Sequence, residues 1–151
     1  GMMMMSYGYV YVAKVALGAD QSQTIKAFVE AEAYDGPSII IAYAHCIAHG
    51  INMVKGLEEQ KKAVASGHWP LFRYNPMLSL EGKNPLNLDS KAPSIKLDEY
   101  IYNENRYMVL KRSDPERAKQ LLEKSQKHVE EQYELYRYLA DKKGSAAEAG
   151  K

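Results

Sequence analysis

The 151-residue chain has the length of about one domain, and its 46% hydrophobic and 26% charged residues are ordinary for a globular protein. Its 20 basic and 19 acidic residues leave a formal net charge of +1, which gives no electrostatic reason to expect nucleic acid or a membrane surface as a partner. No apolar run approaches the ~18 residues of a membrane span. The one cysteine excludes an internal disulfide, so we expect a cytoplasmic protein.

Two apolar segments near the start predict neighbouring strands of a parallel sheet. The first, Tyr7 to Leu17, is rich in aromatic and β-branched residues and is apolar on both alternating faces, which indicates burial on both sides. The second, Pro37 to Ala44, is short and very apolar. With a helix between them they form a βαβ unit, whose crossover should be right-handed.

The segment Asp20 to Tyr34 predicts that helix. Asp20 and Gln23 have the N-cap and N3 spacing of a capping box. Gly36 followed by Pro37 ends the helix, because Gly suits the cap and Pro cannot continue it. An apolar stripe recurs at helical spacing, at Ile25, Phe28, Val29 and Ala33.

The middle of the chain changes character. His45 to Met53 predicts a loop of small residues, and Lys55 to Ser66 predicts a short charged helix that ends at Gly67. His68 to Pro93 holds four of the six prolines and predicts extended segments and loops. We expect this stretch to pack against the rest of the protein through Trp69, Leu71, Phe72 and Tyr74.

Helices are predicted for the last part of the chain. One runs from Leu97 to Arg112. Ser113 and Glu116 then have the spacing of a second capping box, and Pro115 is tolerated in the first turn of a helix that runs to about Lys142. The apolar stripe of this helix is Ala118, Leu121, Leu122, Val129, Tyr136, Leu139 and Ala140.

These elements predict an α/β fold with an incomplete, doubly wound parallel sheet, followed by an extended segment and two or three helices. Two fully apolar strands cannot form a stable open sheet, because their edges need partners. The missing strands should come from an earlier part of the domain or from another chain, and self-association is expected. Residues 6–142 form the folded part in this interpretation, and residues 143–151 form a disordered tail.

Cys46 is the residue that we expect to carry chemistry. It follows the carboxyl end of the second strand, the edge at which open α/β sheets bind ligands. His45 and His49 flank it in an H-C-x-x-H pattern, which is one ligand short of a closed tetrahedral metal site. The residues alone leave open a metal site, a thiol activated by a histidine, and an inert half-buried thiol, of which they favour the last.

Other cofactor signals are absent from the sequence, which has no G-x-G-x-x-G, Walker or G-x-S-x-G motif. Arg73, Arg106 and Arg112 could bind an anion, although ordinary ion pairs explain them more simply. The mixed charges of the last helix predict a solvated face.

Four strings, however, resemble one enzyme family in order and in detail. They are YGYVYVA from Tyr7, EAEAYDGPSIIIAYAHC ending at Cys46, GHWPLFRYNP from Gly67 and GKNPLNLDSKAP from Gly82. Together they resemble the C-terminal region of the single-chain pyruvate:ferredoxin/flavodoxin oxidoreductases, and the resemblance runs from Ser6 to about Leu139.

The resemblance implies that residues 6–142 are the C-terminal part of a thiamine-diphosphate-binding domain. These enzymes decarboxylate pyruvate oxidatively, transfer the acyl group to coenzyme A, and pass electrons through iron–sulfur clusters to ferredoxin or flavodoxin. Cys46 corresponds to the last of four thiolate ligands of a four-iron–four-sulfur cluster. The other three ligands, and the G-D-G motif that holds magnesium and the diphosphate, are not in this chain.

Three roles therefore remain open at the level of sequence. The chain could be a fragment of the oxidoreductase that holds no catalytic residue and no cofactor of its own and is inactive in isolation. It could be a subunit of a split 2-oxoacid oxidoreductase, with the remainder of the enzyme as its partner. It could also be a non-enzymatic, self-associating binding module, a homo-oligomer held by its sheet edge.

Overall fold

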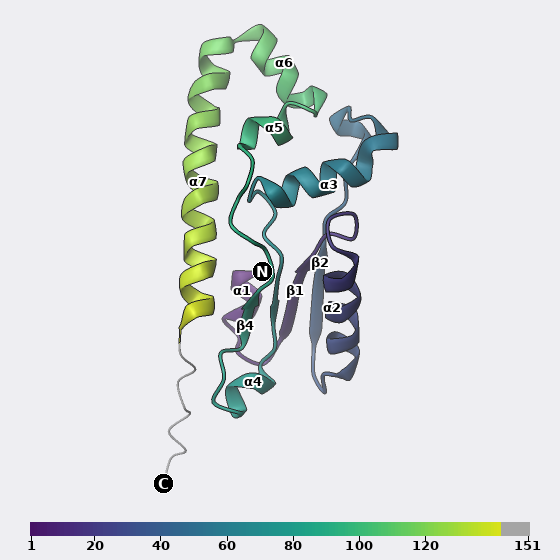
Figure 1. The fold of residues 1–151 in the computed structure, drawn as a ribbon, viewed down its shortest axis with the longest axis vertical. Coiled ribbons are helices and arrows are strands. Elements are labelled where there is room, and N and C mark those ends of the chain that lie inside the picture. The colour runs from purple at the N-terminus through teal and green to yellow at the C-terminus, as the bar shows by residue number, and fades with distance from the viewer. Residues whose placement is uncertain (143–151) are drawn as a thin grey trace.

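The computed structural model describes residues 1–142, and its centre is a four-stranded mixed sheet with the order β2-β1-β3-β4 (Figure 1). β1 (Tyr11–Val15) pairs in parallel with β2 (Ser38–Ala42). β3 (Phe72–Tyr74) pairs antiparallel with β1, and β4 (Leu86–Leu88) pairs antiparallel with β3. The tail predicted for residues 143–151 lies outside the described residues.

The predicted βαβ unit is confirmed, although its first strand is shorter than expected. Tyr7 to Val10 precede β1 because the partner strand reaches back only to Pro37, whose carbonyl accepts from the Tyr11 N–H. Gly8, at φ +76°, turns the chain before the strand begins. β1 itself is buried on both sides, as its two apolar faces predict.

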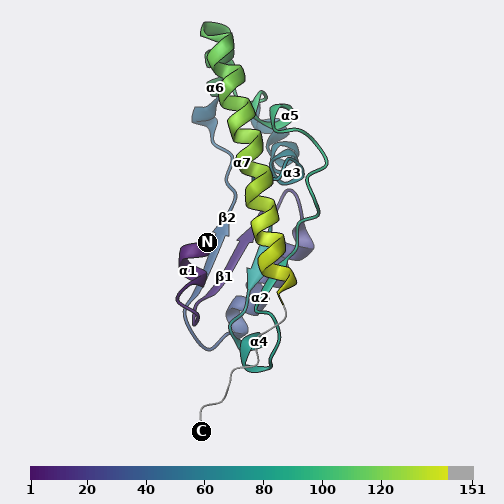
Figure 2. The same cartoon turned by 90° about the vertical axis from the view of Figure 1, so that its left-hand side faces the viewer.

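Two layers of helix cover the sheet. α2 (Gln21–Ala33) lies on one face, where Ala27 packs against Tyr11, Ala13 and Val15 of β1. The long α7 (Pro115–Asp141) runs past the opposite face, and the short α1 (Met2–Met5) lies on that side as well (Figure 2). The core on the α7 side contains Val10, Val12, Phe72, Leu86 and Tyr136.

A second core closes the end of the sheet where β1 and β2 finish. α3 (Gly56–Ala65) and α5 (Leu97–Ile101) gather there, whereas α4 (Met77–Leu80) lies at the other end (Figure 1). Two 3-10 turns, Ile47–His49 and Met53–Lys55, connect β2 to α3. The buried residues of this core are Ala63, Leu97, Tyr100, Ile101 and Val129.

The helix predicted from Leu97 to Arg112 is two helices, α5 and α6 (Asn105–Ser113). The break has a local cause, because the Asn103 side-chain amide donates to the carbonyls of Glu99 (2.6 Å) and Tyr100 (2.9 Å), a bond pattern that competes with helix continuation. Glu104 then occupies the N-cap of α6.

The second predicted capping box is wrong by one residue. Asp114, not Ser113, caps α7, and its Oδ1 accepts from the Arg117 N–H at 3.0 Å. Ser113 is the last residue of α6. Pro115 occupies the first turn of α7 as predicted, where its missing N–H costs nothing.

β3 and β4 were expected only as extended segments. Their strings are short and lie next to Pro76 and Pro85, so no strand pattern identifies them in the sequence. They pair on the far side of β1 from β2, and α7 covers β4. The sheet edge that stays open among the described residues is therefore that of β2, whose residues are half-exposed or exposed.

α2 differs most from expectation in its orientation. Its apolar stripe faces away from the sheet, and Ile25, Phe28 and Val29 are 55% to 62% exposed. The side that packs on the sheet carries Gln23, Thr24 and Ala27. The helix period was thus predicted correctly, but the apolar face of α2 contacts nothing among the described residues that would bury it.

No helix within residues 1–142 is long and apolar enough to cross a membrane.

Candidate functional site

Cys46 lies in a tight turn beyond the carboxyl end of β2. Tyr43 extends the strand pairing by one bond, from its N–H to the Val15 carbonyl (2.9 Å). Cys46 then precedes a single 3-10 turn, in which its carbonyl accepts from the His49 N–H at 3.0 Å. Gly50, at φ +72°, closes the turn. The thiol is half-exposed at the edge of the sheet.

The two histidines of the H-C-x-x-H pattern point to other partners. His45 Nδ1 lies 3.2 Å from the Gln60 amide, and its ring rests on Gly56, where any side chain would collide with it. His49 contacts Arg106 through Nε2 (2.9 Å) and Glu104 through Nδ1 (3.5 Å). Both histidines thus contact other residues, and neither has a hydrogen bond to the thiol within the described chain.

Residues 1–142 bring no three His, Cys, Asp or Glu side chains together as ligands of one metal ion. The donor set of this turn fits one corner of a thiolate site, because a thiolate is the preferred ligand of an iron–sulfur cluster and the chain has one cysteine. Further ligands would have to approach from outside the chain.

Several apolar side chains of the turn and of its neighbouring segments are open to solvent, and they form an apolar rim next to Cys46 along the chain. Ile47 lies in the turn itself, and Met53 and Val54 follow in the second 3-10 turn. Leu57 at the start of α3 packs against Gly18, beside the exposed Leu17. Such a rim around a thiol is typical of a surface that another protein segment covers.

A buried carboxylate lies behind the turn. Glu104, 3% exposed, contacts Arg106 Nε through its Oε2 (3.3 Å). Its Oε1 accepts from the Tyr100 hydroxyl at 3.4 Å, and the Tyr100 and Tyr43 hydroxyls are 2.6 Å apart. Burial raises the pKa of Tyr43 and of Tyr100, so both stay protonated near neutral pH.

A second buried carboxylate, Glu59, belongs to α3. Its Oε1 has no hydrogen-bond partner within the described chain. Burial, and then the nearby charge of Glu104, raise the pKa of Glu59. Four residues of this region were not singled out from the sequence, namely Tyr43, Glu59, Tyr100 and Glu104. The i, i+4 spacing of Tyr100 and Glu104 could have suggested that pair.

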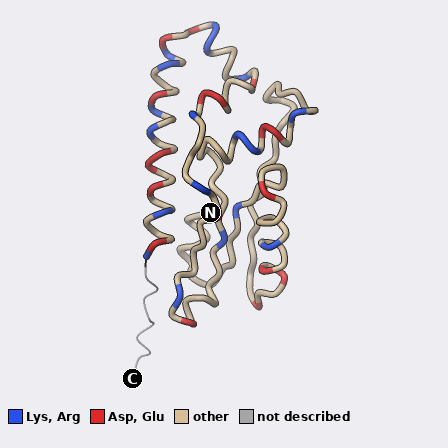
Figure 3. The backbone as a smooth tube through the Cα atoms, viewed as in Figure 1, with Lys and Arg blue, Asp and Glu red and all other residues tan. Residues whose placement is uncertain are grey.

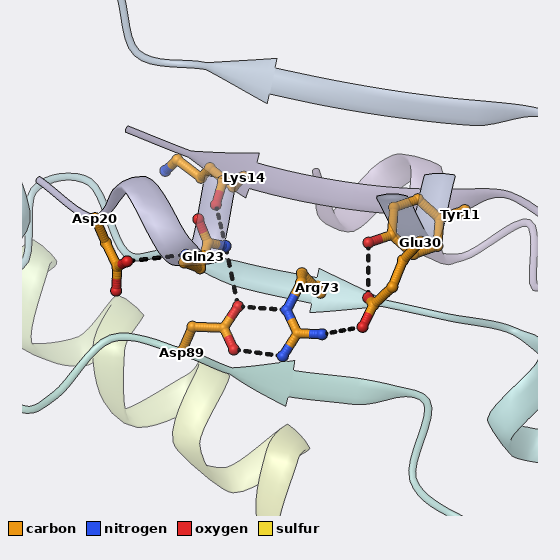
Figure 4. Close-up of polar contacts among 7 residues, drawn as sticks. All are labelled: Tyr11, Lys14, Asp20, Gln23, Glu30, Arg73 and Asp89. Carbon is orange, nitrogen blue, oxygen red and sulfur yellow. Dashed lines mark hydrogen bonds and ion pairs between the residues drawn. The ribbon is translucent and has the colours of Figure 1, made fainter. Parts of the chain in front are cut away.

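Arg73 is part of a structural network and not of an anion site (Figure 4). Its guanidinium binds Asp89 through two hydrogen bonds of 2.9 and 2.8 Å and also contacts Glu30 on α2. The Tyr11 hydroxyl donates to Glu30 (2.9 Å), and Gln23 donates to Asp89 (3.0 Å). The hydrogen bonds to Asp89 raise the pKa of Arg73.

This network explains the orientation of α2. Asp20 caps the helix by accepting from the Gln23 N–H at 2.8 Å, as predicted. The Gln23 side chain, however, donates to the Lys14 carbonyl (3.3 Å) and to Asp89 instead of turning back to Asp20. The polar side of α2 therefore faces the sheet, and its apolar side faces out.

Charges elsewhere are mixed. Lys and Arg alternate with Asp and Glu along α7 (Figure 3), with exposed pairs such as Lys127–Glu131 at 3.7 Å. The predicted solvated face is confirmed. The arrangement matches the near-zero net charge and forms no extended patch of one sign along this helix.

These features define the class of the chain, which is an α/β segment with an open sheet edge, an outward apolar helix face and one thiol beyond its parallel strands. No family model matches it. Over 142 residues it is 58% identical to the pyruvate-flavodoxin oxidoreductase of Nostoc sp., covering 94% of this chain and 12% of that protein. Over 141 residues it is 55% identical to the pyruvate:ferredoxin oxidoreductase of Moorella thermoacetica, covering 93% and 12%.

A third relative is the mitochondrial pyruvate dehydrogenase (NADP+) of Euglena gracilis, which is 44% identical over 149 residues, covering 97% of this chain and 8% of that protein. The chain is thus homologous to a region of the pyruvate-flavodoxin and pyruvate:ferredoxin oxidoreductases, which confirms the resemblance found in the sequence. It spans about 12% of the length of the first two relatives.

Proposed function

We propose that this chain is the segment of a pyruvate:ferredoxin/flavodoxin oxidoreductase that completes the thiamine-diphosphate-binding α/β domain of that enzyme. Residues 6–142 are its C-terminal part, and Cys46 is one of four thiolate ligands of a four-iron–four-sulfur cluster. The observation that carries the proposal is the outward apolar face of α2 next to the open edge of β2. In isolation the chain lacks the thiamine site and is inactive.

The α2 face supports a larger domain on energetic grounds. Ile25, Phe28 and Val29 expose most of their side chains, and fully burying such a residue contributes ~1.5–3 kcal/mol. The neighbouring β2 edge leaves backbone donors and acceptors without a strand partner among the described residues. A further strand beside β2, with its own covering helix, would satisfy both features at once, which is how a doubly wound sheet grows.

The Cys46 turn supports the ligand assignment. A thiol at the carboxyl end of parallel strands lies where α/β sheets bind cofactors, and the exposed apolar rim leaves room for a covering segment. The histidines beside it already have partners, so the turn offers one thiolate.

The names of the relatives support a shared role in pyruvate chemistry. They have pyruvate in common and differ in the acceptor, which is flavodoxin, ferredoxin or NADP+. A segment that is similar in all of them belongs to the common part of the reaction, the oxidative decarboxylation to acetyl-CoA. When bound, thiamine diphosphate with magnesium supplies the bond-breaking chemistry, and the cluster carries the electrons. The role of this chain is to hold one ligand and to cover the domain.

The ligand assignment is tested in the oxidoreductase that contains this segment. Cys46→Ser should remove one four-iron cluster, measured as iron content and as visible absorbance of anaerobically purified enzyme. Ala48→Ser is the control, since it adds the same hydroxyl within the same turn and keeps the thiol. Full iron content in the Cys46→Ser enzyme would show that the assignment is wrong.

The covering role is tested on the surface of α2. Phe28→Ser should weaken association of this chain with the remainder of the enzyme, whereas Leu80→Ser, on α4 at the other end of the sheet and also exposed, should not. If the chain instead forms a stable homodimer through the α2 face and does not bind the remainder, the self-associating module is the better description. Iron–sulfur absorbance or pyruvate turnover in the purified chain alone would contradict the fragment assignment.

A further inference from the structure

The Cys46 turn, residues 43–50, is held from both sides by one buried side chain. We infer that Glu104 is the positioning residue of this turn, which fixes Cys46 through Tyr43 on one side and His49 on the other. Nothing in the sequence resemblance assigns a role to Glu104. The part of the inference that concerns a cluster rests on the proposed function.

The contact on the C-terminal side is through His49. Arg106 Nη1 can only donate, so His49 Nε2, 2.9 Å away, accepts, and the ring proton lies on Nδ1. This assignment follows from the hydrogen-bond network. Nδ1 faces Glu104 Oε2 at 3.5 Å, and Arg106 Nε contacts the same oxygen at 3.3 Å. His49 is thereby held between a carboxylate and a guanidinium.

The contact on the N-terminal side runs through two tyrosines. Glu104 Oε1 accepts from the Tyr100 hydroxyl, which lies 2.6 Å from that of Tyr43. Tyr43 is also fixed by its N–H bond to the Val15 carbonyl and by an edge-on contact with Trp69, with ring centroids 5.2 Å apart. Tyr43 and His49 are each three residues from Cys46, so the two contacts bracket the thiol.

The position of Glu104 in the fold makes this link possible. It is the N-cap of α6, and its backbone joins the two helices, since its N–H donates to the Ile101 carbonyl (3.0 Å) and its carbonyl accepts from the Tyr107 N–H (3.1 Å). The Asn105 N–H also contacts the Gly50 carbonyl, at 3.4 Å, so the start of α6 lies directly against the end of the turn. Burying a carboxylate away from water costs free energy. Both oxygens of Glu104 have polar contacts that offset this cost.

The first test measures amide hydrogen exchange by NMR in the full 151-residue chain. The N–H groups of His49 and Gly50 donate to the carbonyls of Cys46 (3.0 Å) and Ile47 (2.9 Å), so their exchange reports opening of the turn. Glu104→Gln keeps the shape but presents an amide to the donors of His49 and Arg106. We expect exchange at His49 and Gly50 to be about tenfold faster, and unchanged in the α2 helix.

Glu58→Gln is the matched control, because it removes a carboxylate from the exposed side of α3. It should leave the exchange of both amides unchanged. Unchanged exchange in Glu104→Gln, or a uniform increase across β1, α2 and α7, would contradict a positioning role. If Glu104→Gln does not fold, Tyr100→Phe is measured in its place. This variant should speed exchange of the Tyr43 N–H, and an unchanged exchange rate of that N–H would overturn the inference.

The second test uses the cluster-containing oxidoreductase. Glu104→Gln removes a buried negative charge and should raise the midpoint potential of the cluster, whereas the solvent-screened charge of Glu58 should shift it less. An unchanged midpoint potential would contradict the part of the inference that concerns the cluster, and exchange at His49 and Gly50 that stays slow would by itself overturn the positioning role. Faster exchange in the chain, combined with full cluster content in Cys46→Ser, would instead show that the ligand assignment fails and the positioning role holds.

Discussion

Arg73 offers a sharp test of what holds α2 on the sheet. Its guanidinium lies between Asp89 on one side and Glu30 of α2 on the other, and its side chain is 9% exposed. Arg73→Met keeps most of the aliphatic length and removes the charge. The change therefore isolates the network drawn in Figure 4 from simple loss of packing.

The magnitude follows from what remains after the substitution. Two carboxylates, with side chains 25% and 16% exposed, lose their common cation and face each other across a partly buried space. Breaking a buried ion pair by removing one partner costs ~3–5 kcal/mol. Tyr11 and Gln23 still donate to the carboxylates, so we expect a loss near the lower end, about 3 kcal/mol. That is a large share of the ~5–15 kcal/mol typical of a folded domain.

The assay is urea unfolding followed by circular dichroism, with linear extrapolation to water. Arg137→Met is the control, since Arg137 pairs with Glu134 at 2.6 Å but its side chain is 58% exposed, and such pairs contribute ~0–1 kcal/mol. The triple variant Arg73→Met, Glu30→Gln, Asp89→Asn should recover most of the loss. If Arg73→Met costs no more than Arg137→Met, the network does not hold α2 and our reasoning is wrong.

Three further predictions concern single positions. Asp20→Ala should lower the free energy of unfolding by ~0.5–2 kcal/mol, because it leaves the Gln23 N–H without its cap; an unchanged urea midpoint would contradict this. Burial lowers the pKa of Lys14 to about 8, below the unfolded value of ~10.4. Between these two pH values the unfolded chain binds more protons than the folded chain, so the free energy of unfolding should rise with pH there. Lys14→Met should remove this rise, as urea unfolding at several pH values would reveal. Gly67→Ala should destabilise more than Gly82→Ala in thermal melts, since both have positive φ but a Cβ at Gly67 would lie 2.7 Å from Pro93 Cγ, whereas Gly82 faces open space.

The βαβ unit could be predicted because its signals are local. Asp20 caps the helix through the backbone of Gln23, three residues away, and the apolar runs of both strands are continuous. The break at Asn103 was missed because a side chain that bonds carbonyls of its own helix competes with a helical pattern that is otherwise intact. The strands β3 and β4 were missed because they are three residues each and lie between prolines.

The candidate site was predicted in part. Cys46 could be singled out because the position after an apolar strand is a known ligand edge, although its role as a cluster ligand stays a prediction. Glu104 could not be found, since it lies far along the chain from Cys46 and its contacts with Tyr100 and His49 exist only once α5 and α6 pack on the turn.

The sequence by itself determined the period of each main helix and strand, the thiol at the sheet edge and the homology to a region of the pyruvate oxidoreductases. These depend on neighbours along the chain or on the order of the residues. Only the tertiary structure decided which way α2 faces. Arg73 of β3, Glu30 of α2 and Asp89, which follows β4, meet from separate parts of the chain. Their ion pairs turn the polar side of α2 inward. The apolar stripe that usually marks a core face is thereby left on the outside of the described chain.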